Sequence, residues 1–218
     1  MSIPTLHGPS VKPASGSAPK QLVIFLHGVG ADGDDLISLS DLFARDFPDA
    51  QFISPNAPFP CDMAPFGYQW FSLLDRRPEP MLAGVTTVEP IVNHFIDSQM
   101  KTHGLSAKQV ALVGFSQGTM TSLHVAPRRA EPLAAVVGFS GALLAPDLLP
   151  AAVKSKPPVC LIHGTADQVV PFQAMEIAHE ALNDAGFMCE AHARPRLGHG
   201  IDPEGIDSAI AFLKHALA

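Results

Sequence analysis

The chain has 218 residues, of which 47% are hydrophobic and 16% charged, and its formal net charge is -7. A chain of this length suits one domain with a sizeable core rather than two. Apart from two Arg-Arg pairs it has no basic cluster, which argues against an electrostatic surface for nucleic acid.

The apolar pattern predicts strands that alternate with helices. Residues 1–19 are rich in Pro, Ser and Gly, and we expect them to be irregular. The alternation of strands and helices after residue 20 predicts a mostly parallel α/β sheet with helices on both faces. The predicted strands are residues 21–28, 50–55, 109–115, 133–139, 158–164 and 187–195, and the predicted helices are residues 34–47, 85–103, 117–126, 172–184 and 203 to the end.

A long segment, residues 56–84, interrupts this alternation. It contains many prolines, shows no clear hydrophobic period, and holds the only Trp and the only Tyr of the chain. Two interpretations stay open: a loop that packs on the core through its own apolar side chains, or an apolar wall for an acyl chain. On the second interpretation the candidate substrate-binding residues are Phe66, Trp70, Phe71 and Leu73.

Two similar segments, "VGFSQG" and "VGFSGA", each place a serine after an apolar run. Ser116 lies in a G-x-S-x-G pattern, between a predicted strand and a predicted helix, which is typical of a nucleophile elbow. Ser140 lacks the second glycine at the required spacing, and the prolines that follow it disfavour a long helix. We therefore predict that Ser116 is the nucleophile and that Ser140 ends a parallel strand close to the site without reacting.

A serine nucleophile requires a histidine base, and the base requires an acid that orients it. His199 lies between two glycines, after a strand and before the last helix, where the ring can reach a site at the strand ends. The other histidines that follow the serine and the acid candidates lie on predicted helices or in a solvent-facing strand row: His179, His192 and His215.

For the acid we favour Asp167, in a short polar loop at the carboxyl end of a strand, where ligands bind in open α/β sheets. Asp147 is the alternative, because it also follows a strand. The remaining aspartates in this half of the chain look like helix-end or helix-surface carboxylates: Asp184, Asp202 and Asp207.

An oxyanion hole requires two backbone N–H groups. One is expected from Gln117, directly after the nucleophile, at the positive end of the following helix. The other is expected from the glycine-rich "LHGVGADG" loop, with Val29 as the donor. The alternative for this loop is an ordinary glycine turn, and it does not resemble a phosphate loop because no Gly-Lys-Ser/Thr follows.

Six segments together resemble the phospholipase/carboxylesterase family of small α/β-hydrolases, which includes bacterial carboxylesterases and acyl-protein thioesterases. They are "LHGVGADG", "PNAP", "QWF", "GFSQG", "HGTADQVVP" and "GHG", in the order found in that family, and the resemblance covers about residues 20–215. It implies the α/β-hydrolase fold without a cofactor, and it implies the same triad and the same oxyanion amides. We also expect no metal, because the sequence has no H-E-x-x-H motif and no compact His/Asp cluster beyond the one assigned. Three positions depart from the usual pattern: Val29 where leucine is frequent, Ser72 where aspartate is frequent, and Thr119 where glycine is usual.

These observations predict that residues 1–218 form one α/β-hydrolase domain and that the protein is a carboxylesterase, a serine hydrolase that cleaves short to medium acyl esters through an acyl-enzyme. A lysophospholipid or a thioester is a further candidate substrate. An acyltransferase with the same triad, and a non-catalytic binding protein on this scaffold, are the alternatives. We expect a small-molecule partner, a monomer or homodimer, and a cytoplasmic location, since no signal peptide or membrane-length apolar run is apparent.

Overall fold

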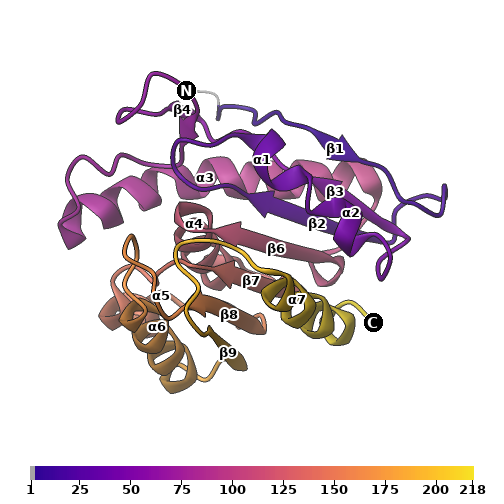
Figure 1. The fold of residues 1–218 in the computed structure, drawn as a ribbon. Helices are drawn as coiled ribbons and strands as arrows, with labels where there is room; N and C mark the ends of the chain where they lie inside the picture. The colour runs from indigo at the N-terminus through magenta and orange to yellow at the C-terminus, as the bar shows by residue number, and fades with distance from the viewer. Residues whose placement is uncertain (1–2) are drawn as a thin grey trace.

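The computed structural model describes residues 3–218 and contains a seven-stranded sheet in the order β1-β3-β2-β6-β7-β8-β9 (Figure 1). Every neighbouring pair is parallel except β1 with β3, which is antiparallel. A separate two-stranded sheet pairs β4 with β5. The strands are β1 (Ser10–Val11), β2 (Gln21–Leu26), β3 (Ala50–Ile53), β4 (Phe59–Pro60), β5 (Tyr68–Gln69), β6 (Val110–Phe115), β7 (Ala135–Phe139), β8 (Val159–Gly164) and β9 (Cys189–Arg194).

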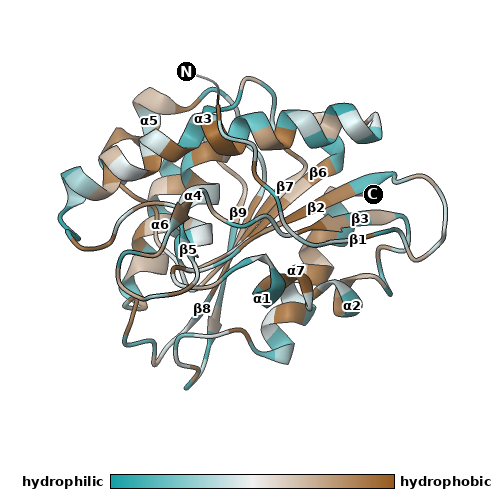
Figure 2. Ribbon diagram, turned by 90° about the horizontal axis from the view of Figure 1, so that it is seen from above, coloured by the Kyte–Doolittle hydropathy of each residue, from teal (hydrophilic) through white to brown (hydrophobic). Residues whose placement is uncertain are grey.

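Helices cover both faces of the large sheet, and Figure 2 shows α3 and α4 on one side of it and α1, α2 and α7 on the other. The α-helices are α1 (Gly33–Ile37), α2 (Ser40–Phe43), α3 (Pro78–His103), α4 (Gln117–Val125), α5 (Leu149–Ala152), α6 (Gln173–Asp184) and α7 (Pro203–Ala216). Short 3-10 helices span Ala107–Gln109, Ala126–Arg128 and Pro146–Leu148.

The central strands are apolar on both faces because each face packs against helices. In β2, Leu22, Ile24 and Leu26 belong to the core on the α3–α4 side. The residues between them, Val23 and Phe25, belong to the core on the α1–α7 side. Side chains of a strand point alternately to opposite faces, so one continuous apolar run supplies both cores.

The predicted mostly parallel sheet with helices on both faces is confirmed, and the six predicted strands are present. Several strands are a few residues shorter than expected, and residues 56–84 also contain β4 and β5; three further differences concern the N-terminal segment and two helices. Two residues of the expected irregular segment form β1, the helix expected from residue 85 begins at Pro78, and the helix expected over residues 34–47 is divided into α1 and α2.

The chemistry of proline and serine explains the last two differences. Pro78 occupies the first turn of α3, where the missing N–H of a proline costs no hydrogen bond. Pro78 therefore begins the helix instead of extending the loop before it. Between α1 and α2, the Ser38 hydroxyl donates to the carbonyl of Asp35 at 3.0 Å. A serine side chain that bonds to the nearby backbone in this way competes with continued helix.

The part of the chain that the structure describes includes no helix with both the length and the apolar character needed to cross a bilayer.

Candidate active site

Ser116 lies at the carboxyl end of β6, directly before the first residue of α4. Its backbone has φ 53° and ψ -113°, which is a strained conformation for a residue with a side chain. The turn is held by hydrogen bonds from Ser116 N to Phe139 O at 2.9 Å and from Met120 N to Ser116 O at 3.1 Å. The strand-to-helix turn therefore has the geometry of a nucleophile elbow.

The two glycines around Ser116 are required by close backbone approaches. A Cβ on Gly118 would lie 1.8 Å from the carbonyl oxygen of Leu26, and a Cβ on Gly114 would lie 2.5 Å from the backbone nitrogen of Thr119. Neither contact can be relieved by moving a flexible side chain. Gly118 thus lets α4 start against the end of β2, and Gly114 lets the end of β6 lie against the first turn of α4.

Ser140 lies at the end of the adjacent strand, at the same level of the sheet. Gly114 pairs with Gly138 and Phe115 with Phe139 across β6 and β7, so the two "VGFS" segments lie side by side in register. Ser140 also has a positive φ of 48°, but no long helix follows it. Its hydroxyl donates to the carbonyl of Gly200 at 3.3 Å, so it contacts the loop that carries His199.

His199 and Asp167 form a close pair at the same edge of the sheet. The Nδ1 atom of His199 lies 2.7 Å from Oδ2 of Asp167, so Nδ1–H donates to the carboxylate and leaves Nε2 as the free ring nitrogen. The second carboxylate oxygen, Oδ1, accepts the backbone N–H groups of Val169 at 2.8 Å and Val170 at 2.9 Å. The acid is therefore fixed by its own loop while it orients the imidazole.

The environment of Asp167 favours its charged form. Burial acts to raise the pKa of this carboxyl, but the hydrogen bonds from His199, Val170 and Val169 outweigh it, and the pKa of Asp167 is below its ordinary value. At neutral pH the group is a carboxylate. It can then balance the positive charge that His199 acquires when it takes a proton.

The ring of His199 packs against Phe115, the residue that precedes Ser116. Their ring centroids are 4.9 Å apart, with an angle of 44° between the ring planes. In residues 3–218 as described, no hydrogen bond joins Ser116 to His199. Such a bond is often long in an enzyme without substrate and shortens when substrate binds.

The glycine-rich loop after β2 lies beside the nucleophile. A Cβ built on Gly28 would be 3.5 Å from the Cβ of Ser116, which places the next residue, Val29, at the edge of the site. Two hydrogen bonds of 2.8 Å, from Gly30 N to Tyr68 O and from Tyr68 N to Ala31 O, hold this loop. Within the described chain, neither Val29 N nor Gln117 N donates to another protein group, so both amides remain available to an oxyanion.

Two buried side chains for which the sequence indicated no role hold this loop and the turn at Ser116 in place. His27 Nδ1–H donates to Gly28 O at 2.7 Å, and His27 Nε2 accepts from Ala57 N at 3.0 Å. Burial lowers the pKa of His27, which keeps the ring neutral and Nε2 able to accept. The side-chain amide of Gln117 accepts from Trp70 N at 2.9 Å and donates to Phe71 O at 2.6 Å.

A third such residue, His163, lies behind the acid. Its Nε2–H donates to Val170 O at 2.9 Å, and the same nitrogen is 3.2 Å from Asp167 Oδ2. The sequence shows His163 as the end of an apolar strand before a glycine, a pattern that equally describes an ordinary buried histidine. Only the fold brings it against the carboxylate.

Comparison with known proteins identifies the family of this chain. The family model described as Phospholipase/Carboxylesterase matches residues 8–217. The chain belongs to this family. The resemblance inferred from the six sequence segments and the predicted α/β-hydrolase fold are therefore confirmed.

The relatives described next align with nearly the whole chain. "Esterase YpfH" of Escherichia coli (strain K12) is 31% identical over 91% of this chain and 84% of its own length. "Acyl-protein thioesterase 1 homolog 1" of Dictyostelium discoideum is 30% identical over 89% of this chain and 90% of its own length. Among solved structures, "Crystal structure of esterase PE8" is 44% identical, with a TM-score of 0.93 over 98% of this chain and all of the other.

One departure from the usual phospholipase/carboxylesterase pattern has a structural account. The side chain of Thr119 fills space that Gly138 of β7 and Gly141 of the following loop leave open. A Cβ on Gly138 would lie 2.5 Å from a Thr119 side-chain atom, and a Cβ on Gly141 would lie 2.3 Å from one. The Thr119 hydroxyl donates to Phe139 O at 2.8 Å. The threonine thus links α4 to β7 immediately behind the nucleophile.

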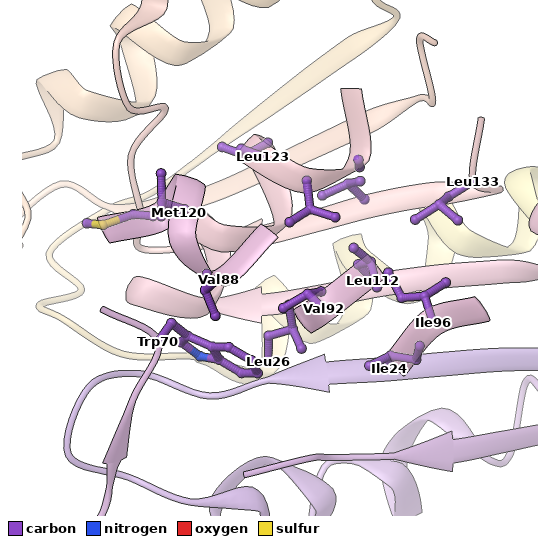
Figure 3. Packing of buried hydrophobic residues seen from close by; sticks show 14 of the residues in the cluster. Ile24, Leu26, Trp70, Val88, Val92, Ile96, Leu112, Met120, Leu123 and Leu133 are labelled. Atoms are coloured by element: carbon purple, nitrogen blue, oxygen red, sulfur yellow. The ribbon is translucent and has the colours of Figure 1, made fainter. Parts of the chain in front are cut away.

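The four candidate substrate-binding residues of this family member occupy different environments. Trp70 and Phe71 are fully buried, and Figure 3 shows Trp70 in the core beside Leu26. Trp70 Nε1–H donates to His27 O at 2.9 Å. Leu73 is half-buried against the same core, whereas Phe66 is 72% exposed. Only the last two therefore present side-chain surface to solvent or to a ligand.

Removal of the Gln117 side chain is expected to destabilise the protein and to loosen the nucleophile turn. Gln117→Ala leaves a buried N–H and a buried C=O of residues 70 and 71 without partners, at a cost of about 2–4 kcal/mol of unfolding free energy. Urea unfolding measures this change. Thr121→Val, which removes only a hydroxyl bonded within α4, is the matched control and should cost less; an equal cost for both would contradict the bridging role.

Proposed function

We propose that this protein is a serine hydrolase that cleaves carboxylic esters through an acyl-enzyme formed on Ser116. The observation that carries the proposal is the 2.7 Å bond between His199 and Asp167 at the sheet edge where Ser116 occupies a strained strand-to-helix turn. Membership of the phospholipase/carboxylesterase family and relatives named esterase support it.

In this mechanism each residue has one role. His199 Nε2 takes the proton of the Ser116 hydroxyl as the oxygen attacks the ester carbonyl, and Asp167 stabilises the resulting imidazolium. The backbone N–H groups of Val29 and Gln117 receive the oxyanion. His199 then gives the proton to the leaving alcohol, and a water molecule, activated in the same way, releases the acid and restores Ser116.

A pre-steady-state assay tests this proposal. With p-nitrophenyl butyrate, we expect an initial burst of p-nitrophenol equal to the concentration of active enzyme, because the acyl-enzyme accumulates. An added alcohol that accepts the acyl group and forms a new ester would favour the acyltransferase alternative. If the protein releases no p-nitrophenol above the background rate, it is a binding protein on a hydrolase scaffold and the proposal is wrong.

We further propose that the acyl chain lies along the apolar part of residues 56–77, with Phe66 and Leu73 as contacts and with Trp70 and Phe71 as their support. Met63, Phe66 and Leu74 expose 43%, 72% and 71% of their surface on this segment. Exposed apolar side chains that gather on one segment are a common feature of surfaces that bind apolar ligands.

Shortening of Phe66 should therefore change the acyl preference. Phe66→Ala is expected to lower the ratio of kcat/KM for octanoate over acetate p-nitrophenyl esters by about threefold to tenfold, since part of an aromatic contact is lost. Met188→Ala is the control, because Met188 is 70% exposed and directly precedes β9, an edge strand of the large sheet to which residues 56–77 contribute no strand. An unchanged ratio with unchanged thermal stability would show that the segment only covers the core.

A further inference from the structure

A cleft lies beside His199, away from residues 56–77. It has a volume of about 240 Å³ and is lined by Asp35, Leu36, Leu39, Phe115 and Ile201. Four of these five side chains are apolar, and Asp35 is exposed. None of the five is one of the substrate-binding residues expected from the sequence.

Two of the lining residues connect this cleft directly to His199. Phe115 is the residue whose ring packs on the imidazole, and Ile201 follows His199 by two positions. The ring edge of Phe115 also lies 3.2 Å from where a Cβ on Gly28 would be, in the loop that carries Val29. The cleft therefore opens between the base and the loop after β2.

The cleft and the proposed acyl wall lie on opposite faces of the sheet. Leu73 and Phe59 of the wall pack against the core on the α3–α4 side. Phe115, Leu39 and Ile201 pack against the core on the α1–α7 side. An ester bound at Ser116 can thus extend one half toward each face.

The chemistry of the proposed reaction decides which half enters this cleft. His199 must give its proton to the oxygen that leaves, so the alcohol portion of the ester lies on the side of the imidazole. The acyl portion, which stays attached to Ser116, has no such requirement. The cleft next to His199 is therefore the place for the alcohol.

The charges around the cleft restrict that alcohol. Asp35 lines it, and Asp32 and Asp34 lie in the same turn of chain, at the start of α1. No lysine, arginine or histidine is among the residues that line it. A carboxylate a few ångströms from a bound charge attracts a cation and repels an anion.

We propose that this cleft binds the alcohol portion of the ester and selects a compact apolar alcohol without an anionic group, with Asp35 favouring a cationic one. The inference rests on the proposed ester hydrolysis. It disfavours substrates whose leaving group carries a phosphate or a carboxylate, such as lysophospholipids and coenzyme A thioesters.

A set of butyrate esters with one acyl group and different alcohols tests the charge preference. Butyrylcholine and 3,3-dimethylbutyl butyrate have alcohols of the same shape with and without a positive charge, and O-butyrylglycolate has a negative one. We expect kcat/KM to be highest for the cationic ester, lower for the neutral one, and at least about tenfold lower again for the anionic one. Asp35→Asn should lower the ratio of the cationic to the neutral ester by about threefold to tenfold.

Asp34→Asn is the matched control, because Asp34 lies one position earlier in α1 but does not line the cleft. It should leave that ratio within about twofold of the wild-type value, because the Asp34 side chain does not line the cleft and is exposed to screening solvent. If Asp35→Asn and Asp34→Asn change the ratio equally, the cleft does not hold the alcohol and the proposal is wrong.

A steric variant tests the position of the alcohol independently of charge. Leu39→Trp should lower the ratio of kcat/KM for benzyl butyrate over methyl butyrate by at least about fivefold, because the indole fills part of the cleft. The ratio compares two substrates of one enzyme preparation, so partial unfolding cancels. An unchanged ratio would overturn the proposal, whereas failure to hydrolyse methyl butyrate in the wild type would overturn the proposed function itself.

Discussion

Replacement of Ser116 by alanine is expected to lower kcat for p-nitrophenyl butyrate by about 10⁴-fold or more, while the protein still folds. The hydroxyl oxygen of Ser116 is the attacking atom in the proposed mechanism. Its side chain makes no hydrogen bond within the described chain that the fold needs. The loss should therefore appear in activity and not in the unfolding temperature.

A glycine at this position separates the catalytic from the structural effect. Ser116 has φ 53°, so Ser116→Gly removes the strain of a side chain in this conformation and should stabilise the protein by about 1 kcal/mol while it remains inactive. Ser140→Gly is the matched control, since Ser140 has φ 48° at the equivalent point of the next strand. That variant should keep most of the activity; loss of activity in both glycine variants, or in neither, would contradict the assignment.

The second large effect is expected for Asp167→Asn, at about 10⁴-fold in kcat. In wild type, Oδ1 accepts two backbone N–H groups and Oδ2 accepts His199 Nδ1–H. The asparagine oxygen would remain with the two backbone donors, which places the NH₂ group against Nδ1 of His199. The imidazole would then carry its proton on Nε2, where it cannot take the proton of Ser116.

His163 makes this substitution more unfavourable. Its Nε2, which carries a hydrogen, lies 3.2 Å from the atom that becomes NH₂, so two donors would face each other. Asp167→Asn should therefore also lower the free energy of unfolding. Asp147→Asn is the control, because Asp147 was the alternative acid suggested by the sequence and its side chain is exposed. This variant should keep wild-type activity and stability.

The pH dependence of stability gives this prediction a definite sign. The pKa of Asp167 is lower in the folded protein than its ordinary value, so the ionised carboxylate stabilises the fold at pH values above the ordinary value of about 4. That contribution is lost as the pH falls through the lowered folded pKa. Urea unfolding should show wild type more stable than Asp167→Asn at pH 7, with a difference that narrows below about pH 4; a constant difference would contradict the charged role of Asp167.

Much of the fold was predictable because it depends on local signals. The strands of the sheet are continuous apolar runs, and helices separate them at regular intervals. The start of α3 was not predicted, because prolines at 78 and 80 signal a loop and the first turn of a helix equally well. Which of these they form depends on the packing that follows: a Cβ on Gly84 of α3 would lie only 2.8 Å from Phe71.

The candidate site was predictable to the extent that its residues occur in motifs and at strand ends. Ser116, His199 and Asp167 each follow a strand of a parallel sheet, where the carboxyl ends of strands meet at one edge. The supporting contacts were not predictable, because they join residues far apart in the chain. The Gln117 amide bonds to the backbone of residues 70 and 71, and His27 bonds to Ala57, and no sequence period reports such pairs.

Contacts between residues far apart in the chain also decide the environment of the aromatic residues in residues 56–84. Trp70 looks like a ligand contact in a sequence with a single tryptophan, but it packs beside Leu26 and its Nε1–H bonds to His27 O (Figure 3). Burial of a tryptophan requires a partner for its N–H. That partner is a backbone carbonyl, which the sequence cannot distinguish from any other.

The most direct test of a nucleophile at the end of β6 is covalent labelling of the intact protein with a fluorophosphonate, followed by peptide mass mapping. The account predicts one adduct per chain, on Ser116, at an undiminished level in Ser140→Ala and absent from Ser116→Ala. An adduct on Ser140 or any other residue of the wild-type protein, or no adduct at all, would contradict it.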